Sequence, residues 1–231
     1  TCRFKDTISL IRLAEKNQKM LAEAFMYIHH PQFKKIIDFT NSKNNMLQSI
    51  VCRFGIPELD NPGFRNDLNL CGGAFWDVGS YAISAILELF PSETFEVKYS
   101  EIRKSSNSEV DTFGRALVKF SNKVVAYLEW GVGIAYKNEI ELWSDDESLY
   151  TDKIFSKPID YQVKYTLRDK NGNKSIVNGE KSEQFINMFN SFISIYSSPD
   201  KISYEAKKVI NRASLMNQIL NVASISQNND L

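Results

Sequence analysis

The segment Cys71–Tyr81 (CGGAFWDVGSY) constrains the fold most, because two glycines lead directly into a long apolar helix predicted to reach Phe90. Its apolar residues recur at helical spacing and predict one stripe that faces a core. Asp77 and Tyr81 are four residues apart, so a helix places them on one face. A phenol oriented by a carboxylate can transfer protons. The spacing alone fits better a buried tyrosine and an aspartate favoured by the helix dipole.

The composition limits the classes of partner. The chain has 231 residues, enough for one sizeable domain or for one domain and part of another. Lys and Arg together number 28, as do Asp and Glu, so the zero net charge predicts neither a nucleic-acid partner nor an anionic membrane surface. No apolar run is expected to span a bilayer, and no signal-peptide pattern opens the chain.

The cysteines indicate the compartment. Cys2, Cys52 and Cys71 are scattered and odd in number. We therefore expect reduced thiols in a cytoplasmic protein, and neither a disulfide framework nor a metal site.

The remaining patterns predict an α+β fold in which helices cover one face of an open, largely antiparallel sheet. Polar loops are expected at 41–45 and 104–108, and a frayed end at 227–231. The expected helices are 6–17, 32–38, 72–90, 182–196 and 203–225. The expected strands are 20–26, 47–54, 95–99, 112–120, 124–131, 139–143, 163–167 and 175–177.

The other motifs and residues of the chain indicate packing more than chemistry. The chain contains no G-x-G-x-x-G and no G-x-x-x-x-G-K-[ST] motif, so it carries no phosphate-binding loop of its own. His29 and His30 are adjacent and make a poor metal pair, and His30 is expected to cap a helix or to line a cleft. The aromatic residues Tyr127, Trp130 and Trp143 are expected to pack on a sheet face, including a self-association surface.

Three stretches resemble the Gfo/Idh/MocA family of NAD(P)-dependent oxidoreductases. Residues 23–32 (EAFMYIHHPQ) are similar to E-A-F-M-Y-R-F-H-P-Q. Residues 64–66 and 71–81 together are similar to R-x-(x)n-G-G-G-A-L-x-D-I-G-x-Y, the most specific of the three motifs. Residues 184–189 are similar to a late Q-x-x-x-F helix, so the resemblance covers nearly the whole chain.

The resemblance implies a division into domains. Residues 1–25 would be the last helix and strand of an N-terminal Rossmann domain, with the catalytic Lys of an E-K-P motif immediately upstream of Thr1. Residues 26–231 would form the C-terminal substrate-binding and oligomerisation domain, similar to the C-terminal domain of glyceraldehyde-3-phosphate dehydrogenase. The open sheet face would associate into a homodimer or homotetramer.

The resemblance also implies an activity. Hydride would pass between NAD or NADP and a sugar, cyclitol or related diol, with Tyr81 transferring the proton and Asp77 orienting it. The same match makes Arg65, His30 and Tyr27 candidate substrate contacts and Glu23 a weaker cofactor contact. This chain alone is expected to be inactive, because the cofactor would be bound mainly upstream.

Two departures from the family pattern bear on this expectation. Ile28 replaces an arginine that would contact substrate or cofactor, and Cys71 replaces the first of three glycines. The alternative is a non-catalytic sugar-sensing or oligomerisation module on the same fold. Retention of Asp77 and Tyr81 favours the enzyme.

Overall fold

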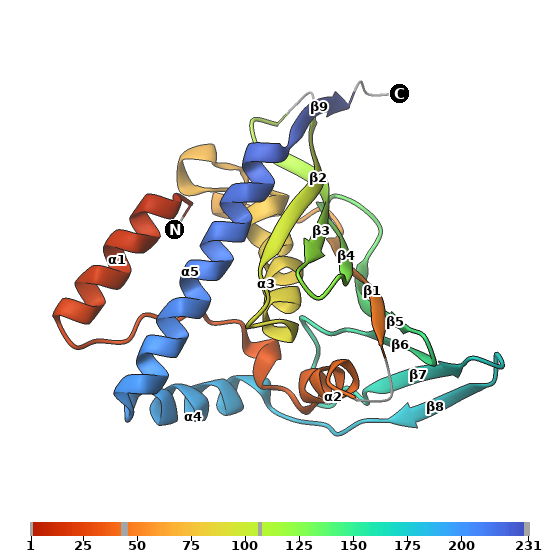
Figure 1. Cartoon of the computed structure of the whole chain (residues 1–231). Coiled ribbons are helices and arrows are strands. Elements are labelled where there is room, and N and C mark those ends of the chain that lie inside the picture. Colours follow the sequence, from red (N-terminus) through yellow and green to blue (C-terminus); the bar gives the residue numbers. More distant parts are fainter. Residues whose placement is uncertain (1, 43–45, 106–107, 229–231) are drawn as a thin grey trace.

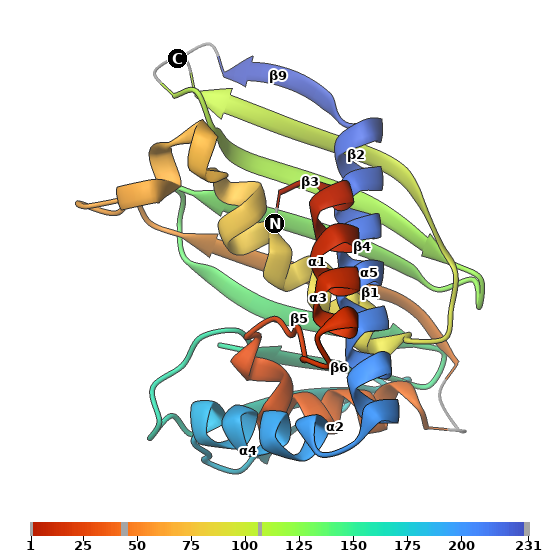
Figure 2. The same cartoon turned by 90° about the vertical axis from the view of Figure 1, so that its left-hand side faces the viewer.

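The computed structural model describes residues 2–42, 46–105 and 108–228. One nine-stranded sheet, with the order β8-β7-β6-β5-β1-β4-β3-β2-β9, is covered on one face by the helices (Figures 1 and 2). Only the pairs β1–β4 and β2–β9 are parallel among the described strands. The predicted fold class is confirmed.

The elements have the following bounds. The helices are α1 (Phe4–Lys16), α2 (Pro31–Thr40), α3 (Ser80–Leu89), α4 (Gln184–Tyr196) and α5 (Pro199–Val222). The strands are β1 (Leu47–Ile56), β2 (Phe95–Ser105), β3 (Asp111–Phe120), β4 (Val125–Val132), β5 (Lys137–Ser144), β6 (Glu147–Asp152), β7 (Lys164–Asp169), β8 (Lys174–Asn178) and β9 (Ser224–Asn228). Short 3₁₀ turns cover Met26–His29, Gly63–Asn66 and Leu68–Leu70, and a π-helical turn, Phe75–Gly79, leads into α3.

The core lies between the helices and the inner sheet face. Along β4, Ala126, Leu128 and Trp130 are buried while Tyr127 is 49% exposed, the alternation expected of a strand with one covered face. Trp130 therefore packs on the covered face and Tyr127 lies on the open face, because residues three apart on a strand point to opposite faces. Gly79 and Gly114 make room for the indole, since a Cβ at Gly114 would lie 2.4 Å from it.

Several expected elements differ from the structure. The expected strand 20–26 is extended but unpaired up to Phe25, because a strand needs a neighbour and none lies beside it in the described ranges. β6 was missed, and the last helix ends at Val222, where the chain forms β9 against β2. β2 continues to Ser105 into the expected loop 104–108. Residues 43–45, 106–107 and 229–231 of the expected loops and frayed end lie outside the described residues.

One helical segment, Leu68–Leu89, is long and apolar enough to cross a membrane by length and composition, contrary to the expectation from the sequence. Within its most apolar window, 67% is buried inside the protein. The segment thus has the burial of a core helix.

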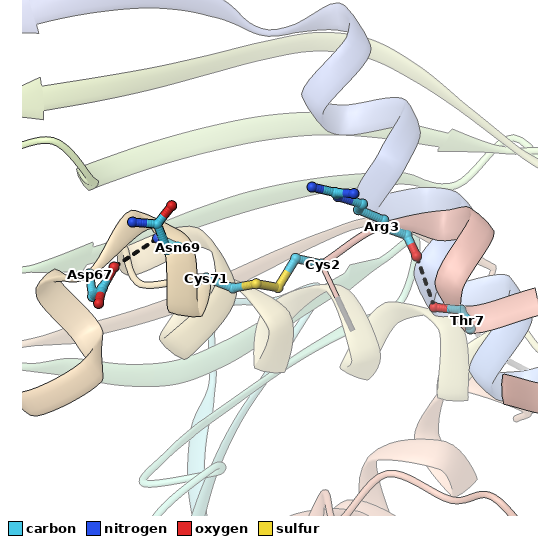
Figure 3. The surroundings of a disulfide bond; sticks show 6 residues. All are labelled: Cys2, Arg3, Thr7, Asp67, Asn69 and Cys71. Carbon is cyan, nitrogen blue, oxygen red and sulfur yellow. Dashed lines mark hydrogen bonds between the residues drawn. A yellow bond between two sulfur atoms is a disulfide. The ribbon is translucent and has the colours of Figure 1, made fainter. Parts of the chain in front are cut away.

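The cysteines also differ from the expectation. Cys2 and Cys71 form a disulfide with a Cα–Cα distance of 6.1 Å, and only Cys52 is free (Figure 3). The prediction of three reduced thiols was wrong, because a separation of 69 residues says nothing about distance in the fold.

Candidate functional site

The Gly72–Gly73 pair shapes the entry to the helix that carries Asp77 and Tyr81. A Cβ at Gly72 would lie 2.3 Å from the Arg65 carbonyl oxygen, and one at Gly73, whose φ is +111°, would lie 2.2 Å from Asp111 Oδ1. The Gly73 amide donates to the Arg65 carbonyl oxygen at 2.8 Å. Because only glycine fits this close approach, the entry brings Arg65 next to the helix.

Asp111, at the start of β3, holds the other side of this entry. Its Oδ2 accepts a hydrogen bond from the Phe75 amide at 2.7 Å, which satisfies a backbone donor at the start of the π-helical turn. Burial raises the pKa of the Asp111 carboxyl to about 6, against the lowering effect of the Phe75 hydrogen bond. Sequence reasoning missed Asp111, because nothing local links the start of a strand to a helix 36 residues earlier.

We expect Asp111→Asn to flatten the pH dependence of stability between about pH 4 and pH 6. The folded protein binds this proton more tightly than the unfolded chain, whose pKa is 3.8, so its free energy of unfolding falls as the pH rises through that window. A shift of this size corresponds to about 3 kcal/mol. Urea unfolding of both proteins at several pH values measures the slope. If the free energy of unfolding changes equally with pH in the wild type and in Asp111→Asn, Asp111 is not the group that titrates in this window.

Asp77 pairs with Arg65. The Arg65 Nε lies 2.6 Å from Asp77 Oδ2, and its guanidinium lies 4.9 Å from the centre of the Phe64 ring. Asp77 therefore bonds to Arg65, with no hydrogen bond to the Tyr81 hydroxyl among the described residues. The π-helical turn places the carboxylate at a widening of the helix, a feature frequent at functional sites. Two predicted site residues are thus brought together.

Tyr81 is half-buried, and its hydroxyl is nearly free of partners. Its ring meets Phe25, Phe54 and Phe155 edge-on, at centroid distances of 5.1, 5.4 and 5.7 Å. Within the described ranges the hydroxyl makes one contact, 3.9 Å to the weak acceptor Met26 Sδ. Burial and then the Asp77 charge raise the pKa of Tyr81, with Arg65 opposing them. Tyr81 is therefore a neutral phenol at neutral pH, with a proton to donate.

Tyr27 contrasts with Tyr81. It is fully buried, and its hydroxyl pairs with Ser84 Oγ at 2.6 Å. Its ring centre lies 6.0 Å from that of Tyr81. Tyr27 thus lies next to Tyr81, with its hydroxyl already used inside the core.

His30 and Glu23, the other candidate residues, are each engaged in contacts within the protein. His30 is 2% exposed, and its Nδ1 accepts from the Gln32 amide at 3.0 Å, which confirms the expected helix cap. Burial and the charge of Lys157 lower the pKa of His30 to about 4. Glu23 pairs with Arg212 of α5. The structure therefore groups Arg65, Asp77 and Tyr81, with Tyr27 next to Tyr81 and His30 as the cap of α2.

Arg212 is the centre of a buried ionic cluster that sequence reasoning missed. Its guanidinium contacts Glu23, Glu88 of α3 at 3.0 Å and Glu205 at 3.5 Å, and Lys208 contacts Glu88 at 2.9 Å. Burial would lower the pKa of Arg212, but the three carboxylates raise it. The cluster joins α5, α3 and the segment before α2. The sequence did contain a sign of this cluster, because Glu205, Lys208 and Arg212 are three and four residues apart and share one helix face.

A cavity of about 260 Å³ opens beside Asp77. Its walls include Glu23, Phe25, Trp76, Asp77, Ser80 and Arg212. The size suits one ring-sized group with both apolar and charged neighbours. The described residues contain no cluster of three or more His, Cys, Asp or Glu that could hold a metal ion.

Residues 46–150 match the family described as the GFO/IDH/MocA C-terminal domain. This part of the chain is therefore similar to a GFO/IDH/MocA C-terminal domain. The matched range runs from β1 to β6 and contains Arg65, Asp77 and Tyr81.

Curated relatives of this chain include sugar-nucleotide reductases. A dTDP-3,4-didehydro-2,6-dideoxy-alpha-D-glucose 3-reductase from Saccharopolyspora spinosa is 28% identical over 74% of this chain and 51% of its own length. An enzyme of the same name from Streptomyces antibioticus is 25% identical over 94% of this chain and 66% of its own length. The chain thus spans about half to two thirds of the length of these relatives.

Solved structures show the same fold. KijD10, a 3-ketoreductase from Actinomadura kijaniata in complex with NADP and TDP-benzene, superposes with a TM-score of 0.90, at 23% identity over 98% of this chain and 70% of that one. Variants of KijD10 with a Lys→Ala and with a Tyr→Phe substitution superpose with TM-scores of 0.85 and 0.89, at 23% and 22% identity over 98% of this chain and 68% and 70% of those chains.

Proposed function

We propose that this chain is the substrate-binding and catalytic half of an NADP-dependent sugar oxidoreductase, and that it reduces a keto group on a nucleotide-linked sugar. The observation that carries the proposal is the Tyr81 hydroxyl, half-buried and without an oxygen or nitrogen partner among the described residues. A tyrosine that served packing alone would satisfy its hydroxyl, as Tyr27 does with Ser84. Tyr81 is thus available to a ligand.

Each site residue has its own role in the proposed reaction. NADPH, when bound, would supply the hydride and become NADP⁺. Tyr81, kept neutral by its raised pKa, donates the proton to the carbonyl oxygen that becomes the hydroxyl. Arg65 neutralises and orients Asp77, whose second oxygen is left to accept from a sugar hydroxyl.

The cofactor fits this chain only in part. The cavity beside Asp77 can hold a ring, but the described residues form no glycine loop for the pyrophosphate. The unpaired segment before Met26 and the exposed Leu10 and Leu13 of α1 are places where an upstream domain would pack. We therefore assign residues 1–25 to a nucleotide-binding domain and residues 26–231 to the substrate domain.

The substrate class rests on the relatives. Four of them carry the name of a dTDP-sugar 3-reductase. The test is consumption of NADPH and NADH by the full-length protein with a dTDP-linked keto sugar and with the free keto sugar. We expect NADPH and the nucleotide-linked substrate to give the higher kcat/KM. Binding of the sugar nucleotide without turnover would support the alternative, a sugar-sensing module.

We expect residues 1–231 alone to leave NADPH unoxidised, because no part of the chain's sequence is a glycine fingerprint for the pyrophosphate. The full-length protein at the same concentration is the control. Oxidation of NADPH by the isolated chain, in proportion to added chain, would contradict the proposal that the cofactor is bound mainly by a separate nucleotide-binding domain.

We also propose that the outer sheet face mediates self-association. On this face Tyr127 of β4 and Trp143 of β5 are 49% and 65% exposed and flank β1. We expect Trp143→Asp to shift a dimer or tetramer to monomer in sedimentation at micromolar concentration, because a charge would be buried at the contact. Ile193→Asp, on the exposed side of α4, is the control and should leave the assembly unchanged. A wild-type monomer would contradict the proposal.

A further inference from the structure

We propose that Cys2 and Cys71 form a reversible redox latch. In its oxidised state the latch holds the segment 57–71, which carries Arg65, against the start of α1. In its reduced state it releases this segment. The inference concerns the order of the segment and does not depend on the proposed reaction.

Apart from the Arg65–Asp77 ion pair, the segment 57–71 has few other tertiary restraints. None of its side chains is buried, including those of its two 3₁₀ turns. Phe64, Leu68 and Leu70 are 52%, 54% and 60% exposed, so its apolar side chains contribute little burial. Segments with so little burial open locally at low free-energy cost. The disulfide therefore supplies a large share of what keeps this segment in place.

The disulfide joins this segment to a packed element. Cys2 lies two residues before α1, which packs on α5 through Ile11, with Ala206 and Val209 as its buried neighbours. Cys71 closes the turn Leu68–Leu70, and the next two amides bond to the carbonyl oxygens of Asp67 and Arg65, each at 2.8 Å. A restraint on Cys71 thus passes through the Gly72 amide to the backbone of Asp67 and through the Gly73 amide to the backbone of Arg65.

The backbone at Cys71 indicates that the thiol matters there. Its φ is +60° and its ψ is 40°, in the left-handed region where glycine has the lowest cost. Cys71 adopts this backbone conformation in spite of its steric cost, and it bonds to Cys2, 69 residues away in the sequence.

The sulfur atoms are accessible to small thiols. Both cysteines are partly exposed and line an open hollow with Arg3, Asp6, Asn69 and Trp76. One thiolate of a dithiol reductant attacks one sulfur atom, the S–S bond breaks, and the other cysteine leaves as a thiolate. The second reductant thiol then displaces the first cysteine. Two electrons pass from the reductant, which becomes a disulfide, to the two cysteines, which take up two protons. A small-molecule disulfide reverses the sequence.

The test is amide hydrogen exchange of 57–71 in the full chain, oxidised and then reduced with dithiothreitol. We expect reduction to speed exchange in this segment by about tenfold or more, with β1 and β4 unchanged. Maleimide labelling after unfolding reports the redox state. It should label Cys52 alone in the oxidised protein and all three cysteines after reduction.

The variants separate the latch from general effects of the reductant. Cys2→Ser and Cys71→Ser should exchange fast without reductant and show no response to it, and Cys71→Gly should do the same without the left-handed backbone cost. Cys52→Ala, at a thiol buried in the core, should keep the wild-type response. Equal exchange of 57–71 in the oxidised and reduced wild type would overturn the proposal, as would labelling of all three cysteines without reductant.

Discussion

Replacement of Tyr81 by Phe is expected to lower the kcat of the full-length protein by about 10²–10⁴-fold, the usual loss for a general acid. The loss should fall on kcat more than on KM, because the proton moves only in the transition state. Stability should change by less than about 0.5 kcal/mol, since the hydroxyl contacts only Met26 Sδ among the described residues while the ring keeps its aromatic neighbours. Steady-state kinetics and the melting temperature, measured on the same preparation, check both statements.

Tyr27→Phe is the matched control, because it removes a hydroxyl from a neighbouring ring. Its loss leaves Ser84 without this partner in the core, so we expect a destabilisation of about 1 kcal/mol with kcat nearly unchanged. Asp77→Asn should lower kcat less than Tyr81→Phe if Asp77 only orients substrate. A Tyr81→Phe protein with undiminished kcat would remove Tyr81 from the mechanism.

Replacement of Arg212 by Met is expected to destabilise the folded chain by about 3–5 kcal/mol, because it removes a cationic partner from the largely buried carboxylates of Glu88 and Glu205, which Lys208 also contacts. Urea unfolding at neutral pH measures the change in the free energy of unfolding.

Arg53→Met provides the comparison, because Arg53 pairs with Glu129 and Glu139 on the open sheet face and its side chain is 38% exposed. We expect that change to cost no more than about 1 kcal/mol, as solvent screens the pair. Equal effects of the two substitutions would mean that the Arg212 cluster is no better sheltered than a surface pair.

The sequence by itself determined the elements whose signals are local. Apolar and β-branched runs predicted β1, β3, β4 and β5, and the helical spacing of apolar residues predicted that α3 faces the core. The Gly72–Gly73 entry and the helix that follows marked Asp77 and Tyr81, and the resemblance added Arg65, which the structure sets 2.6 Å from Asp77. These features depend on neighbours along the chain, so periodicity and motif spacing suffice to predict them.

The tertiary structure alone decided the pairings between distant segments. The Cys2–Cys71 disulfide, the Asp111 bond to Phe75 and the Arg212 cluster each join residues far apart in sequence. Trp130 lies inward because its strand position has the parity of Leu128, and the segment before Met26 stays unpaired because a strand forms only beside another strand. Such contacts depend on which surfaces meet, and that information is spread over the whole chain.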